Sequence, residues 1–122
     1  MTTLAWPLEG ERVVIQAGAG PDDVVIVRRA DGAVAGAATL GSESGGSLVI
    51  ERLCIDTGMR GYGLGSEAAR LVLDAATAAG YHEVQAWAPP DRGLAVYFWC
   101  RMGLRPVFGA GRSGGLEFVR AR

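Results

Sequence analysis

Residues Ile55 to Gly65 read I-D-T-G-M-R-G-Y-G-L-G, a glycine-rich turn between two regular elements. The apolar run Ser47–Asp56 predicts a central strand buried on both faces, and apolar residues at helical spacing predict an amphipathic helix over Ser66–Ala79. Glycines let the backbone approach an anion, and a helix directs its unpaired N–H groups and positive dipole end toward the turn before it. The stretch predicts a phosphate-binding turn; the plainer interpretation is a turn that only reverses the chain.

The rest of the chain predicts a single domain over residues 1–122. Further strands are expected at Arg12–Gln16, Asp23–Arg29, Ala33–Leu40, His82–Ala88, Leu104–Ala110 and Leu116–Ala121, with a second helix over about Arg92–Met102. Asp31-Gly32 is a hairpin signal, and Gly80 and Gly103 end the two helices. The order β-β-β-β-α-β-α-β-β predicts a mixed sheet with helices packed on it, in the α/β (α+β) class.

Composition narrows the classes of partner. The chain has 122 residues, a formal net charge of −1, 49% hydrophobic residues and 20% charged residues. These values are typical of a globular, near-neutral domain, so no nucleic-acid partner is expected. The N-terminus has no basic region and no segment reaches membrane-spanning length, so we expect a cytoplasmic protein with no membrane partner.

The cysteines and the single histidine do not predict a metal site. Cys54, Cys100 and His82 lack the spacing of zinc ligands. We expect both thiols to be reduced and packed as small apolar side chains. His82 is expected to lie exposed at the start of its strand.

Two other phosphate-binding loops fit the turn less well. A Walker-type loop needs a lysine before Ser or Thr, and the chain contains no lysine. A dinucleotide-binding turn needs a third glycine where Ser66 stands, and its ribose-binding acid should end a strand, whereas Glu83 begins one. The dinucleotide interpretation is kept only as a distant alternative.

The turn and the segment after it resemble the GNAT superfamily of acyl-CoA-dependent N-acyltransferases. That family carries Arg or Gln, two residues, Gly, one residue, then Gly or Ala; Arg60, Gly63 and Gly65 match it, and Ile55 matches the aliphatic residue that ends the strand. A second block is matched by Ala95, Phe98, Gly103 and Leu104. The resemblance covers Leu48–Val107 and implies a mostly antiparallel sheet of about seven strands with at least two helices.

The resemblance implies acetyl-CoA or coenzyme A as the cofactor. Backbone amides of the turn would bind the pyrophosphate, and main-chain groups of the strand end would pair with the pantetheine arm. The second helix would add Arg92, where the family often has Asn, and Trp99; Arg92 could equally be a solvated residue. The candidate cofactor-binding residues are Leu53, Cys54, Ile55, Arg60, Gly61, Tyr62, Gly63, Leu64, Gly65, Ser66, Arg92 and Trp99.

The candidate catalytic residues are Glu51 and Tyr97. Glu51 is expected on one face of its strand with Leu53 and Ile55, where desolvation would raise its pKa toward that of a general base. The alternative is a structural pair with an arginine. Trp99 stands where the family commonly has its tyrosine acid, and an indole is no proton source. Tyr97 is the substitute, although two helical residues turn it about 200° away.

The acceptor side departs from the family as well. Only Ala17–Asp22 separates the first two expected strands, where family members usually insert one or two helices. The acceptor is therefore expected to be a small-molecule or peptide amine, and a homodimer could close the open side through Trp6, Trp87 or Trp99. Two alternatives stay open: a non-catalytic acyl-CoA-binding module that regulates or scaffolds a partner, and another acyl-CoA reaction such as decarboxylation.

Overall fold

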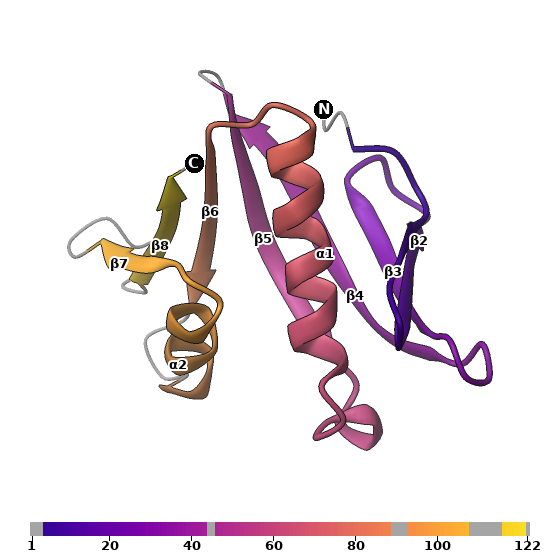
Figure 1. Cartoon of the computed structure of the whole chain (residues 1–122). Coiled ribbons are helices and arrows are strands. Elements are labelled where there is room, and N and C mark those ends of the chain that lie inside the picture. The colour runs from indigo at the N-terminus through magenta and orange to yellow at the C-terminus, as the bar shows by residue number, and fades with distance from the viewer. Residues whose placement is uncertain (1–3, 44–45, 89–92, 108–115, 122) are drawn as a thin grey trace.

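The described part of the chain forms a mixed sheet with two α-helices (Figure 1). The computed structural model describes residues 4–43, 46–88, 93–107 and 116–121. Within them the strands are β1 (Leu8–Glu9), β2 (Val13–Ala17), β3 (Asp23–Arg28), β4 (Val34–Glu43), β5 (Ser47–Ile55), β6 (Glu83–Ala88), β7 (Arg105–Val107) and β8 (Leu116–Ala121). The helices are α1 (Leu64–Ala78) and α2 (Gly93–Arg101), with a 3₁₀ turn at Thr57–Met59.

The sheet has the order β1-β2-β3-β4-β5-β6-β8-β7. All neighbouring strands are antiparallel except β5 and β6, which are parallel because α1 connects them. The predicted class and the order of the expected elements are confirmed. The two-residue strand β1 was not predicted, and the part of the expected strand Leu104–Ala110 beyond residue 107 lies outside the described residues.

Helix α1 covers one face of the sheet, lying in front of its central strands in Figure 1. Its buried side chains recur at helical spacing and meet a continuous core. Strand residues from β2 to β8 complete that core: Val13, Ile15, Val24, Ile26, Ala38, Leu40, Leu48, Ile50, Val84, Ala86 and Phe118. No described helix packs on the other face of β2 to β5, where Gln16, Arg52 and Cys54 are exposed.

Both helices end as the sequence predicts. At the end of α1, Gly80 has a φ of 95°, and the Tyr81 N–H donates to the Ala76 carbonyl at 3.0 Å. At the end of α2, Gly103 has a φ of 92°, and the Leu104 N–H donates to the Trp99 carbonyl at 3.1 Å. This six-to-one hydrogen bond with a left-handed glycine is the Schellman stop, which fixes where the chain leaves each helix.

Strand β5 divides into two halves at a β-bulge. Over Ser47–Ile50 it pairs with β4 on one side and with β6 on the other. Its register with β4 then shifts, so that Glu51 is an extra residue, and the pairing with β6 stops after Ile50 and Ala86 although both strands continue. A bulge bends and twists its strand, so β5 and β6 diverge from this point.

Burial follows the same division. Ser47–Ile50 are all buried, whereas Glu51, Arg52 and Cys54 are exposed and Leu53 and Ile55 are half-buried. The prediction that this strand is buried on both faces along its length is therefore wrong for its second half. An apolar sequence cannot report the loss of the β6 neighbour, because that loss depends on the bulge.

Candidate functional site

The glycine turn leads directly into α1. Gly61 and Gly63 have φ values of 90° and 75°, left-handed conformations that an L side chain rarely adopts. Gly63 is the N-cap of α1 and provides no side chain to cap the first N–H groups of the helix. These N–H donors are therefore directed into the turn, where an anion can accept their hydrogen bonds. The positive end of the helix dipole attracts the anion to the same place.

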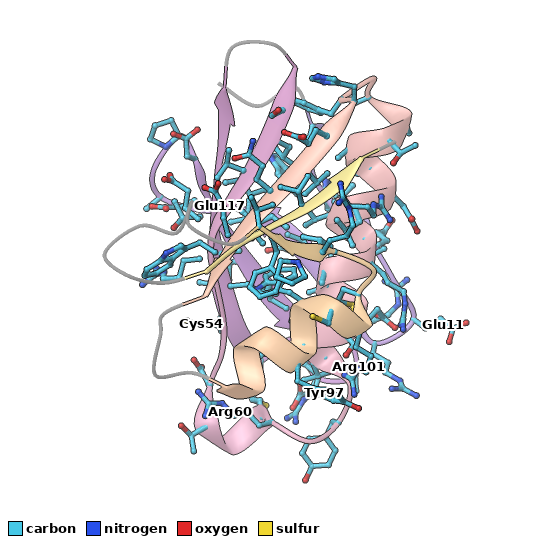
Figure 2. All side chains as sticks on the ribbon, turned by 90° about the vertical axis from the view of Figure 1, so that its left-hand side faces the viewer. Glu11, Cys54, Arg60, Tyr97, Arg101 and Glu117 are labelled. Atoms are coloured by element: carbon cyan, nitrogen blue, oxygen red, sulfur yellow. The ribbon has the colours of Figure 1, made fainter. Side chains whose placement is uncertain are left out.

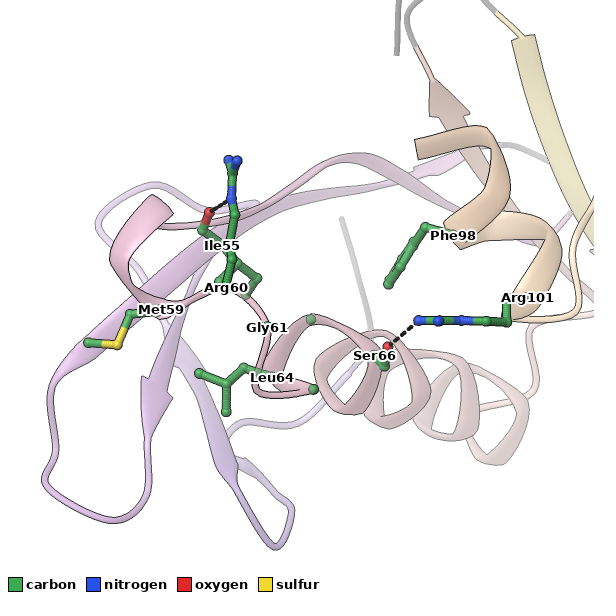
Figure 3. Close-up of a pocket in the computed structure, with 10 residues that line it drawn as sticks. Ile55, Met59, Arg60, Gly61, Leu64, Ser66, Phe98 and Arg101 are labelled. Carbon is green, nitrogen blue, oxygen red and sulfur yellow. Dashed lines mark hydrogen bonds between the residues drawn. The ribbon is translucent and has the colours of Figure 1, made fainter. Parts of the chain in front are cut away.

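A cavity of about 430 Å³ lies at this turn (Figure 3). The end of β5, the glycine turn, the first turn of α1 and α2 all contribute to its walls. Its lining residues are Ile55, Met59, Arg60, Gly61, Gly63, Leu64, Gly65, Ser66, Phe98 and Arg101. Seven of the predicted cofactor-binding residues thus line one cavity, and Met59, Phe98 and Arg101 were missed.

Two arginine side chains hold the glycine turn in place through hydrogen bonds to backbone carbonyls. The Arg60 Nε donates to the Ile55 carbonyl at 2.9 Å, which ties the turn to the end of β5. The Arg12 Nη1 donates to the Tyr62 carbonyl at 3.2 Å. These bonds hold the turn against the strand and against β2, so its backbone is arranged before any ligand arrives.

Glu67 anchors the same helix end to the sheet. Its Oε2 accepts hydrogen bonds from the backbone N–H groups of Arg12 at 2.6 Å and Val13 at 2.8 Å, at the start of β2. Glu67 lies in the first turn of α1, where a negative charge also interacts favourably with the helix dipole. This carboxylate fixes the position of the first turn of α1 relative to β2.

Helix α2 supplies the opposite wall of the cavity. The Arg101 Nη2 donates to the Ser66 Oγ at 3.0 Å, across a sequence separation of 35 residues. Phe98 lines the cavity one helical turn before Arg101. Positions three apart share a helix face, so the spacing of Phe98 and Arg101 on the predicted second helix could have indicated that both face the same side.

The three predicted residues of the strand end have different surroundings. Ile55 lines the cavity, and Leu53 packs against the core. Cys54 is exposed on the other face of the sheet, and Cys100 is exposed on α2. The prediction that both cysteines pack as small apolar side chains is wrong, because alternation along β5 turns Cys54 away from α1. His82 is exposed, as predicted.

The prediction that Glu51 shares a desolvated face with Leu53 and Ile55 is also wrong. Leu53 pairs with Ala38 and so shares its face. Gly41 is three residues from Ala38 and therefore faces the opposite side of the sheet. The Glu51 carboxylate lies 3.5 Å from the place that a Cβ on Gly41 would occupy. The extra residue at the bulge turns Glu51 to this exposed face, at the point where β5 and β6 diverge.

The aromatic residues of α2 separate onto two faces. Trp99 is 4% exposed and belongs to the core, where its ring meets Phe98 edge-on at 4.9 Å. Tyr97 is 63% exposed, and the Arg101 Cζ lies 5.6 Å from its ring centroid. Trp99 does not line the cavity, so its predicted contact with a cofactor is not supported there. Arg92 lies outside the described residues.

Among residues 4–43, 46–88, 93–107 and 116–121, no group of three His, Cys, Asp or Glu side chains is placed to hold a metal ion. No helix in these ranges is long and apolar enough to span a bilayer. What the cavity offers is backbone N–H groups, two arginines and a strand edge. Such donors bind phosphate groups and amide-bearing chains without a metal.

Comparison with known proteins agrees with this geometry. The family model described as "Acetyltransferase (GNAT) family" matches residues 2–104. A Vibrio cholerae protein assigned as a ribosomal-protein-serine acetyltransferase has a TM-score of 0.81 at 8% identity, over 99% of this chain and 100% of its own. A Bacillus subtilis acetyltransferase solved with CoA has a TM-score of 0.73 at 9% identity, over 91% and 98%.

A third solved structure, Ard1 from Thermoplasma volcanium, has a TM-score of 0.70 at 18% identity, covering 82% of this chain and 70% of its own. No curated protein matches the sequence. At these identities the solved structures establish the fold alone. The family rests on the match over residues 2–104.

Proposed function

This chain belongs to the GNAT acetyltransferase family, and we propose that it transfers an acetyl group from acetyl-CoA to an amine. The observation that carries the proposal is the divergence of β5 from β6, which begins at Glu51 and opens toward the glycine turn and the start of α1. A strand edge and a phosphate-binding turn thus lie in one line. This arrangement suits a ligand with an amide-bearing arm and a pyrophosphate.

The backbone would bind most of the cofactor. Backbone N–H groups of Arg60 to Gly65 donate to the pyrophosphate, and the edge of Leu53 to Ile55 that has lost β6 pairs with the amides of the pantetheine arm. The four residue steps of strand from Ile55 to Glu51 span about 13 Å. A cofactor with its phosphates at the turn therefore directs its thioester along β5 toward Glu51.

Glu51 is the proposed general base, acting directly or through a water that it holds. The amine loses a proton to this base and its nitrogen forms a bond to the thioester carbonyl carbon; the carbon–sulfur bond then breaks and the thiolate leaves. Because Glu51 lies on the sheet face that no described helix covers, the amine approaches from that face. The short β2–β3 connection, Gly18–Asp22, leaves the approach open to a small-molecule or peptide amine.

The leaving thiolate needs no dedicated acid, because a thiol has a low pKa compared with an alcohol or amine. The buried Trp99 cannot supply a proton, and the hydroxyl group of Tyr97 belongs to an exposed side chain on α2. We therefore propose that the thiolate leaves without being protonated by a dedicated residue. A fall in kcat of about 100-fold in Tyr97→Phe would instead assign an acid role to Tyr97.

The test is release of coenzyme A from acetyl-CoA across a panel of small amines and peptides with unblocked N-termini. The expected result is amine-dependent release together with mass-spectrometric detection of the acetylated amine. Calorimetric titration with acetyl-CoA runs in parallel, so that cofactor binding is known for the same sample. Folded protein that binds acetyl-CoA and acetylates no amine in the panel contradicts the transferase proposal.

A second candidate is a non-catalytic acyl-CoA-binding module. The placement of Trp99 favours it, because a buried indole replaces the family's tyrosine acid. This candidate predicts tight binding of acetyl-CoA without turnover in any amine. A robust turnover that collapses in Glu51→Gln excludes it.

A further inference from the structure

The cationic side chains of the cavity, Arg60 and Arg101, reach it from opposite sides, as Figure 3 shows. Arg60 extends on the Ile55 side, where its Nε is bound to the Ile55 carbonyl. Arg101 extends from the last turn of α2 to Ser66, beyond the final glycine of the turn. No Asp or Glu is among the residues that line this cavity.

The charge of Arg101 is held in place by neutral partners. Its Nη2 donates to the Ser66 hydroxyl at 3.0 Å, and its guanidinium lies 5.6 Å from the centroid of the Tyr97 ring. Within the part of the chain that the structure describes, the ion pairs are Arg28–Asp31 and Arg29–Glu9, so no carboxylate neutralises Arg101. The other guanidinium N–H groups and the full positive charge stay available to an anion at the cavity.

Coenzyme A carries two kinds of phosphate, and the cavity offers two kinds of donor. The pyrophosphate is matched by the backbone amides of the turn. The ribose 3′-phosphate is a monoester with a charge between −1.5 and −2 near pH 7, as phosphomonoesters have, and such a group gains most from a guanidinium fork. Arg101 reaches Ser66 on the side of the turn away from Ile55 (Figure 3). With the pantetheine arm along the end of β5 and the pyrophosphate at the turn, the ribose would follow on the Arg101 side.

We propose that Arg101, held by Ser66 and Tyr97, binds the ribose 3′-phosphate and makes the site select coenzyme A over dephospho-coenzyme A. This inference rests on the proposed use of acyl-CoA. Ser66 and Tyr97 are positioning residues in it: the hydroxyl fixes the end of the guanidinium and the ring fixes its face. The predicted Tyr97 thereby acquires a role on the cofactor side of α2.

Calorimetric titration of coenzyme A and of dephospho-coenzyme A separates the two phosphates. Wild type is expected to bind coenzyme A about 10-fold or more tightly, the ratio that a charge-assisted hydrogen bond supplies. In Arg101→Gln, the affinity for coenzyme A falls to that for dephospho-coenzyme A, and the latter is unchanged. Arg70→Gln removes an equal charge from an exposed position of α1 and is expected to leave the ratio unchanged.

Two further variants test the positioning roles by the same ratio. Ser66→Ala and Tyr97→Ala are expected to reduce the preference for coenzyme A over dephospho-coenzyme A severalfold. Because Arg101 and Tyr97 are exposed, their variants should fold, which circular dichroism checks. Arg101→Lys retains the charge without the fork and should keep part of the preference.

Three outcomes overturn the inference. Equal affinity of wild type for both ligands means that no group reads the 3′-phosphate. Equal weakening of both ligands in Arg101→Gln places Arg101 on the pyrophosphate instead. Both results leave the proposed acyl-CoA site standing, whereas folded wild type that binds neither ligand overturns the proposed function and this inference together.

Discussion

The two halves of β5 belong to one strand but differ in pairing and burial. Ser47–Ile50 are paired on both edges and buried, and they hold the centre of the sheet together. Glu51–Ile55 keep only β4 as a neighbour and end at the cavity. The bulge at Glu51 separates them. Losing one neighbour over part of its length thus gives β5 an unpaired edge that ends at the cavity.

The largest expected effect is on stability, from the buried half. Leu48 is fully buried in the core, and Leu48→Ala should lower the free energy of unfolding by about 3 kcal/mol, because it removes transfer energy and leaves a cavity. Cys54→Ala, in the exposed half, should change it by no more than about 0.5 kcal/mol. Urea denaturation measures both. Similar losses in the two variants would contradict the division of the strand.

The next effect is on turnover, at the junction of the halves. Glu51→Gln should lower kcat about 100-fold, equivalent to about 2.7 kcal/mol, because the amide cannot accept the proton of the amine. Glu11→Gln is the matched control, since Glu11 is exposed and does not line the cavity; its side chain projects from the edge of the molecule in Figure 2. Steady-state kinetics with the best amine of the panel checks the prediction. Unchanged kcat in Glu51→Gln would assign the base elsewhere.

A smaller effect is expected on cofactor binding at the end of the open half. Ser66→Asp adds a carboxylate to the cavity wall beside Arg101, which should weaken acetyl-CoA binding about 30-fold, or about 2 kcal/mol, because it repels the phosphates and pairs with Arg101. The fold should hold, because an acid in the first turn of α1 is favourable for the helix dipole. Ser66→Asn has the same size without the charge. Equal weakening by Asn and Asp would show that size rather than charge matters there.

The smallest effect is on the pH dependence of stability, at Glu83 of β6, which pairs with Ser47 in the buried half of β5. The Gln85 amide and then the Ser47 hydroxyl donate to Glu83, and these bonds lower its pKa below the ordinary value of 4.5. A lowered folded-state pKa means that ionised Glu83 contributes stability above pH 4.5, which is lost as the pH falls through the lowered value. Thermal unfolding of wild type between pH 6 and 3 should show this small loss, and Glu83→Gln should lack it. An identical acid dependence in both proteins would contradict it.

Local patterns predicted the elements and the turn. The glycines of the turn, the spacing along α1 and the stops at Gly80 and Gly103 act over a few residues, so the sequence carries them directly. The structure confirms the order of the elements, and the family match confirms the resemblance to the GNAT family. The two-residue strand β1 is too short to show a period, and it depends on its pairing with Val14 and Ile15 of β2.

The errors have tertiary causes. An alternating pattern placed Glu51 beside Leu53, but one bulged residue reverses the face, and the bulge is set by the register with β4. The place of Arg101 at the cavity was not predicted, because its partner Ser66 is 35 residues away in the sequence. The family motif drew attention to Trp99, whereas α2 turns Phe98 to the cavity and Trp99 to the core.

Hydrogen–deuterium exchange with and without coenzyme A tests the central claim most directly, because it reads both halves of β5 in one experiment. Without ligand, Ser47–Ile50 should exchange slowly and part of Glu51–Ile55 rapidly, since one edge of the second half lacks a partner strand. Saturating coenzyme A should slow exchange over Leu53–Ile55 and over Arg60–Ser66, and leave Ser47–Ile50 unchanged. No change in the open half or the turn at saturating coenzyme A would contradict the account.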